Sequence, residues 1–108
     1  MIFNTGSALL DAVVLAVISK EGEVGSYGYK ITQDTMKVID ISESTLYPVL
    51  RRLKSENLLG VYDKAYDGRN RRYYYLTEQG YQRLGEYSSE WKIYSEKIDS
   101  LLKEARYE

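Results

Sequence analysis

The chain has 108 residues, enough for one domain, and its 44% hydrophobic and 29% charged residues are typical of a globular protein. Cysteine and histidine are both absent, which excludes disulfides, the usual zinc sites and Ser-His or Cys-His nucleophile pairs. No apolar run reaches the roughly 18 residues that span a bilayer, and no signal peptide pattern is present. We therefore expect a cytoplasmic protein with no membrane partner, no metal and no cofactor.

The net charge of −1 does not itself indicate a nucleic-acid partner, but the charges are unevenly distributed. Residues 42–75 hold seven Lys/Arg and four Asp/Glu, a net charge of +3, whereas residues 1–41 and 76–108 each carry −2. A phosphate-binding face on an acidic body would produce this pattern. A chance fluctuation in a charge-rich chain is the alternative.

The first predicted helix, residues 6–19, is apolar on nearly every side and is interrupted by Asp11. A helix that is apolar all round must be covered all round. In a domain of this size we expect a second chain to supply the additional cover. A central core helix within one monomer is the alternative.

Glycines at 22, 25 and 28 separate this helix from a short helix expected over Tyr29–Val38, with Ser26 as its cap. A third helix is expected over Ser44–Glu56, with Ser42 at its N-cap. Its apolar residues follow the i, i+3, i+4, i+7 spacing of one buried stripe. These residues are Leu46, Val49, Leu50 and Leu53.

Two strand-like runs follow, Gly60–Tyr66 and Arg71–Thr77, and residues 67–70 separate them. Asp67-Gly68 is a strong hairpin signal. Thr77 is expected to cap a long helix that continues to about residue 106.

The long helix carries a stripe whose members are alternately four and three residues apart, the spacing of a coiled-coil seam. The stripe consists of Tyr87, Trp91, Tyr94, Ile98, Leu101 and Ala105. It favours docking on a partner helix, and hence a homodimer. Packing against its own domain is the alternative.

The order helix, helix, helix, hairpin, long helix predicts a mostly α fold with a small β-hairpin. We expect a winged helix-turn-helix domain over residues 1–77, with its N-terminal helix also in the dimer interface, and a dimerisation helix over residues 78–108. In that plan the second helix of the pair enters the major groove. The residues expected to contact DNA from it are Ser44, Thr45, Tyr47, Pro48, Arg51, Arg52 and Lys54.

The hairpin, or wing, adds three cations close to one turn, Arg69, Arg71 and Arg72. They repel one another unless an anionic partner is present, so we expect them to contact phosphates. Some of the helix residues have structural alternatives. Arg52 and Lys54 also fit solvated helix charges, and Tyr47 also fits a half-buried core residue.

Three segments, Gly28–Ile31, Ser44–Leu53 and Gly68–Thr77, resemble those of PadR-family transcriptional regulators, with Thr-Leu-Tyr-Pro and Arg-Arg-Tyr-Tyr-x-Leu-Thr in the same order. The length and single long C-terminal helix are similar to the short, multidrug-sensing branch. The resemblance implies a prokaryotic or phage repressor that dimerises through its first and last helices. We add Tyr29, Lys30 and Tyr74 to the expected DNA contacts.

In that branch, a tryptophan of the last helix pairs across the dimer and sandwiches flat aromatic ligands. Trp91 is similar in position, and it is the only tryptophan of the chain. We expect it to line an effector pocket at the dimer interface. A plain interface anchor is the alternative. The other residues expected at this interface are Leu10, Val13, Val14, Tyr94 and Ile98.

The sequence therefore predicts a repressor that binds a palindromic operator in double-stranded DNA as a homodimer, released by a small aromatic ligand. The alternative is a protein-interaction module on the same fold. An enzyme is not expected, because the chain has no histidine, cysteine, glycine-rich phosphate loop or clear pair of carboxylates.

Overall fold

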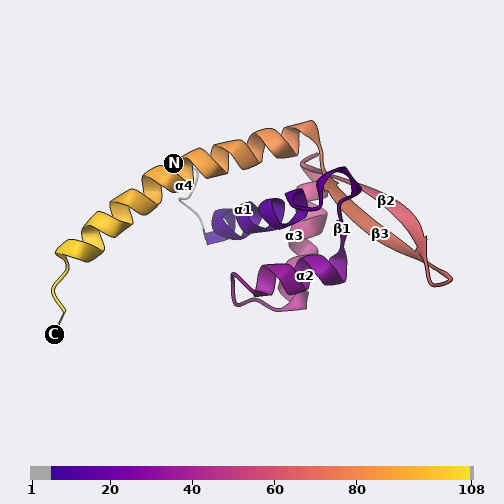
Figure 1. Ribbon diagram of the computed structural model, residues 1–108, viewed down its shortest axis with the longest axis horizontal. Helices are drawn as coiled ribbons and strands as arrows, with labels where there is room; N and C mark the ends of the chain where they lie inside the picture. Colours follow the sequence, from indigo (N-terminus) through magenta and orange to yellow (C-terminus); the bar gives the residue numbers. More distant parts are fainter. Residues whose placement is uncertain (1–5, 108) are drawn as a thin grey trace.

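The computed structural model describes residues 6–107 and contains four helices and a three-stranded antiparallel sheet within them (Figure 1). The helices are α1 (Gly6–Ser19), α2 (Gly28–Met36), α3 (Glu43–Ser55) and α4 (Glu78–Glu104). The strands are β1 (Ser26–Tyr27), β2 (Leu59–Tyr66) and β3 (Arg69–Leu76), and a 3-10 turn, η1 (Gly22–Val24), precedes β1. This is the predicted winged helix fold, with one strand more than expected.

The core lies between α1, α3 and the base of the sheet, because each contributes its apolar side. In α3, Leu46, Leu50 and Leu53 are completely buried, as predicted, and Val49 is partly buried at the edge of the stripe. Helix α1 buries one side in this core, whereas Leu9 on its other side is exposed. Contacts within this chain therefore account for the apolar residues on one side of α1 but not for those on the other side.

The wing is built around a two-residue turn. Asp67 and Gly68 have φ values of 50° and 78°, and Tyr66 pairs directly with Arg69. Positive φ at both central residues is typical of a type I′ hairpin, which glycine and aspartate accept readily. The expectation of a four-residue connection was wrong, because residues 69 and 70 already belong to β3.

The expected cap at Ser26 was also wrong. Ser26 is buried in β1, opposite Tyr74, and Tyr27 is the N-cap residue of α2. No local pattern indicates β1, because a two-residue strand is defined by its pairing with β3 and not by its own residues.

Helix α4 begins where Thr77 was predicted to cap it. Thr77 Oγ1 accepts a hydrogen bond from Gly80 N at 3.0 Å and donates one to the carbonyl of Asn57 at 2.7 Å. The first turns of α4 pack near α1, and the C-terminal half projects away from the domain (Figure 1). Of the predicted seam, Tyr87 is buried against its own domain, while Ile98 and Leu101 are exposed.

None of the helices within residues 6–107 is long and apolar enough to cross a membrane.

Candidate nucleic-acid interface

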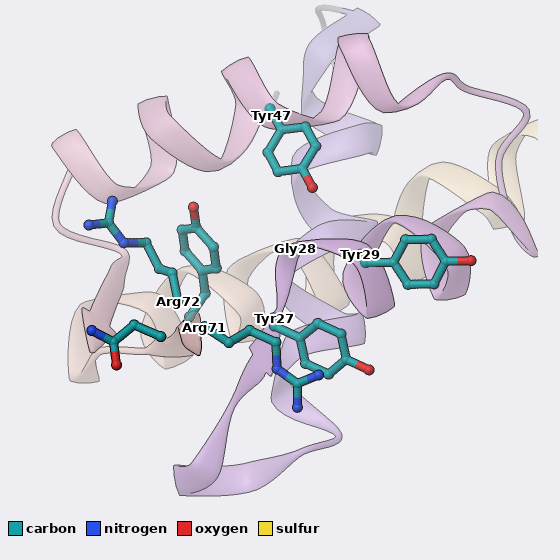
Figure 2. Close-up of a pocket in the computed structure, with 8 residues that line it drawn as sticks. Tyr27, Gly28, Tyr29, Tyr47, Arg71 and Arg72 are labelled. Carbon is teal, nitrogen blue, oxygen red and sulfur yellow. The ribbon is translucent and has the colours of Figure 1, made fainter. Parts of the chain in front are cut away.

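An open groove of about 550 Å³ lies where the start of α2, the first half of α3 and strand β3 approach one another (Figure 2). Its lining includes two arginines and four tyrosines, and none of the lining side chains is acidic. The residues are Tyr27, Gly28, Tyr29, Tyr47, Asn70, Arg71, Arg72 and Tyr74. Cations and hydrogen-bond donors of this kind favour an anionic ligand such as a phosphate backbone.

Tyr47 extends from α3 towards α2 (Figure 2). Its ring occupies space that is free because Gly28 has no side chain. A Cβ atom at Gly28 would lie only 2.8 Å from Cε1 and 3.0 Å from the hydroxyl oxygen of Tyr47. Tyr47 remains 39% exposed. Its ring thus packs against the backbone of α2 but is still accessible to a ligand in the groove. The position of Tyr47 is compatible with both interpretations of the sequence, a half-buried structural residue and a DNA contact.

Arg69 and Arg72 are the more accessible wing cations. Arg69 is exposed beside the turn, and the Arg72 side chain is 56% exposed. Arg72 Nε lies 3.5 Å from Oδ1 of Asp63, its cross-strand neighbour. An ion pair this exposed contributes little to stability, so the guanidinium of Arg72 can exchange Asp63 for a phosphate at low cost.

Arg71 is placed differently from Arg69 and Arg72. Its guanidinium carbon lies 3.6 Å from the ring centroid of Tyr27. Figure 2 shows Arg71 running alongside Tyr27, whereas Arg72 leaves β3 towards α3. Because side chains alternate along a strand, Arg72 lies on the opposite face of β3 from Arg69 and Arg71, so the three arginines predicted as one phosphate-binding cluster are divided between two faces.

Besides Arg72, two cations expected to contact DNA are ion-paired within the chain, Lys30 and Arg52. Lys30 Nζ lies 2.6 Å from Glu21 Oε1 and 2.9 Å from Asp34 Oδ2. The hydrogen bonds to Glu21 and Asp34 raise the pKa of Lys30, and Lys30 lowers the pKa of Asp34. Arg52 Nη2 lies 2.5 Å from Oδ1 of Asp11, a contact that raises the pKa of the arginine. Contact of either cation with DNA competes with these ion pairs.

The other residues predicted on α3 are exposed, namely Ser44, Thr45, Pro48, Arg51 and Lys54. Ser42 occupies the N-cap position as predicted, but its side chain does not bond to the helix backbone. Its hydroxyl lies 2.9 Å from that of Ser44 and 3.1 Å from that of Thr45. These three hydroxyls form a polar cluster at the N-terminus of α3, where a base or phosphate can be hydrogen-bonded.

Three residues of the groove, Tyr27, Gly28 and Asn70, were not among the DNA contacts predicted from the sequence. Tyr27 lies in β1, which the sequence did not reveal, and Asn70 was assigned to the turn. The sequence signal that points to Tyr27 is its position directly before the Gly28–Ile31 segment.

A second, apolar groove of about 570 Å³ lies between α1 and α4 and ends at the connection between α2 and α3. Trp91 lines it and is 45% exposed. The other lining residues are Leu9, Ala12, Val13, Ala16, Val38, Ile39, Leu84, Tyr87 and Ser88.

The predicted effector-pocket residues are only partly assembled in this apolar groove. Val13 and Trp91 line it. Val14 is fully buried in the core, Leu10 packs against the core, and Tyr94 and Ile98 lie further along α4. Helical periodicity explains the difference, because Val13 and Val14 are adjacent in sequence but point about 100° apart.

Comparisons with known proteins identify a family and several similar proteins. The sequence profile of the "Transcriptional regulator PadR-like family" matches residues 14–86. A protein of Lysinibacillus sphaericus, "Uncharacterized protein X", is 37% identical over 95 residues, which cover 83% of this chain and 84% of that protein.

Two crystal structures are similar along nearly the whole chain. That of smu.1704 from Streptococcus mutans UA159 has 35% identity and a TM-score of 0.82, with 100% of both chains covered. That of the PadR-like transcriptional regulator BC4206 from Bacillus cereus has 30% identity and a TM-score of 0.81, covering 92% of this chain and 96% of that one.

Proposed function

Because this chain belongs to the PadR-like family of DNA-binding transcriptional regulators, we propose that it is a cytoplasmic repressor that binds a palindromic operator as a homodimer. The observation that carries the proposal is the groove between α3 and the wing, which brings Tyr47 and Arg72 to one accessible, donor-rich surface. In a winged helix protein this surface faces the DNA.

In this proposal α3 enters the major groove. The hydroxyl cluster at its N-terminus and Tyr47 reach base edges, and the exposed Arg51 contacts a base or a phosphate. Arg69 and Arg72 hold the phosphate backbone next to the wing. Phosphate contacts fix the register of the protein on DNA, whereas base contacts select the sequence.

The test is a binding titration on a duplex that the wild-type protein selects from a random-sequence library. Arg72→Ala should weaken binding to all sequences and lower the slope of log affinity against log salt by about 0.9, the value for one phosphate contact. Tyr47→Ala should change the selected sequence. If the wild-type protein selects no duplex, the chain instead fits a protein-interaction module.

The dimer is supported by the apolar surface that this chain leaves exposed on α1 and α4. Leu9 and Trp91 line that surface, and Leu101 extends it towards the end of α4. A second copy related by a twofold axis covers these residues and places two α3 helices on half-sites about 34 Å apart. Such an arrangement requires a palindromic operator.

The proposed effector is a planar hydrophobic molecule bound beside Trp91. The apolar groove is lined almost entirely by aliphatic and aromatic side chains, and such a lining favours an apolar ligand. Trp91 is the only tryptophan, so titration with planar cationic dyes should quench its fluorescence to a saturable end point. A linear, non-saturating decrease identical to that of free tryptophan would contradict an effector site here.

A further inference from the structure

The guanidinium of Arg71 is enclosed by tyrosines. Its central carbon lies 3.6 Å from the ring centroid of Tyr27, 3.8 Å from that of Tyr66 and 5.3 Å from that of Tyr73. One terminal nitrogen donates a hydrogen bond to the Tyr73 hydroxyl at 2.7 Å. Arg71 Nε is buried and has no hydrogen-bond partner among the described residues. We name Arg71, Tyr27 and Tyr66 the tyrosine clamp.

The tyrosine clamp connects the two strands of the wing to the start of α2, which is distant from them in the chain. Tyr27 is the N-cap residue of α2, Tyr66 is the last residue of β2 at the wing tip, and Arg71 lies in β3. Within the described residues, β1 pairs only with Tyr73 and Tyr74, so the outer part of the wing is a two-stranded ribbon. A ribbon of two strands has little stability of its own, and its twist varies easily.

The strand register places the clamp on one face of the wing and the phosphate-binding arginine Arg72 on the other. Arg71 is opposite Lys64 and Tyr73 is opposite Tyr62, so all four share the clamp face. The Tyr62 and Tyr73 rings stack with centroids 5.4 Å apart, which continues the aromatic layer towards the body of the domain. Fixing Arg71 on this face therefore fixes where Arg72 points on the opposite face.

We propose that Arg71 is a positioning residue for DNA binding, which holds the wing tip against the start of α2 through Tyr27 and Tyr66. This inference rests on the proposed contacts of Arg72 and Tyr47 with DNA. The clamp sets the separation between the wing cations and Tyr47, because Tyr27 directly precedes Gly28, on which Tyr47 rests. Arg71 itself contacts tyrosine rings and not phosphate.

Arg71→Lys separates this role from that of a simple phosphate contact. Lysine retains the charge but loses the planar group that stacks on two rings and reaches the Tyr73 hydroxyl. We expect Arg71→Lys and Arg71→Met to weaken binding to the selected duplex by a similar factor, about tenfold, which is the scale of a lost cation–π pair. The salt dependence of binding should stay that of the wild type.

Tyr66 provides the matched variants. Tyr66→Phe retains the ring and should bind like the wild type, whereas Tyr66→Leu should weaken binding as Arg71→Met does. The combined variant should bind no worse than either single variant, since both changes break the same clamp. Lys103→Met, at the opposite end of the molecule from the wing (Figure 1), is the control for the loss of one positive charge.

Two results would overturn the proposal. The first is that Arg71→Lys binds DNA with wild-type affinity, while Arg71→Met lowers the slope of log affinity against log salt by about 0.9. Arg71 would then be a phosphate contact. The other is additive losses in the combined variant, which would show that Arg71 acts without Tyr66. Both results require a wild-type protein that binds DNA, so they are distinct from failure of the proposed function.

Discussion

At the scale of single residues, Asp11 is the most unusual side chain of the core. It lies in the apolar helix α1 with only 9% of its side chain exposed, and Arg52 of α3 reaches it at 2.5 Å. Arg52 also contacts Glu56 at 3.0 Å. A buried carboxylate that loses its partner is strongly unfavourable, so this pair holds α3 in place against α1.

Arg52→Met should therefore reduce the free energy of unfolding by about 1–3 kcal/mol, less than for a fully buried pair because Arg52 is partly exposed. Urea denaturation measures this change. Lys54→Met, an exposed cation of the same helix, is the matched control and should stay within about 0.5 kcal/mol of the wild type. Equal stability of both variants would contradict the structural role of Arg52. It would also restore Arg52 as a candidate DNA contact.

At the scale of elements, the position of the Tyr47 ring between α3 and α2 depends on Gly28. The ring of Tyr47 occupies the space that a side chain at position 28 would fill. Because Tyr47 is the far end of a flexible side chain, α2 and α3 need not separate when a methyl group is added. The ring would move instead, and the shape of the groove that we propose to face DNA would change with it.

Gly28→Ala should thus weaken DNA binding by about tenfold, the value of one good base contact, with little loss of stability. Binding titrations and urea denaturation on the same samples separate the two effects. Gly85→Ala is the control, since a Cβ atom there meets nothing within 4 Å. That variant should be more stable by about 0.5–1 kcal/mol and bind DNA normally. Unchanged binding by Gly28→Ala would show that the position of Tyr47 is unimportant.

Elements defined by local signals were predicted well from the sequence. The Thr77 cap, the Asp67-Gly68 turn and the buried stripe of α3 each depend on residues within a few positions of one another. Strand β1 was missed and Ser26 was assigned wrongly as a cap, because their structure depends on pairing with residues almost 50 positions later. Local patterns contain no information about such a partner.

At the scale of the whole molecule, the exposed half of α4 gives an elongated shape, with principal extents of 58 × 30 × 20 Å. Ile98 and Leu101 lie on that half, beyond the part of α4 that packs on α1. In the proposed homodimer these residues are covered by the second copy. A charged residue at such a position opposes association without disturbing the core of one chain.

Ile98→Glu should consequently convert the dimer into a monomer of 12.5 kDa, which sedimentation equilibrium measures directly. Loss of the dimer should also reduce affinity for the palindromic duplex by at least tenfold, since the second half-site no longer adds to binding. Ile93→Glu makes the same chemical change at an exposed position of the same helix that is not part of the four- and three-residue spacing of the seam, and it should remain dimeric. If Ile98→Glu is also dimeric, the seam is not the interface.

The sequence by itself determined the helices, the hairpin and the family, because hydrophobic periodicity, caps and turn residues act over a few positions. It also located the basic third of the chain. The tertiary structure decided which of those cations are available to DNA. Arg69 and Arg72 are exposed, whereas Arg52 is held by Asp11 and Arg71 by tyrosines of β1 and β2. The physical reason is that each of these partners except the wing tyrosine comes from a distant segment, and only folding brings them together.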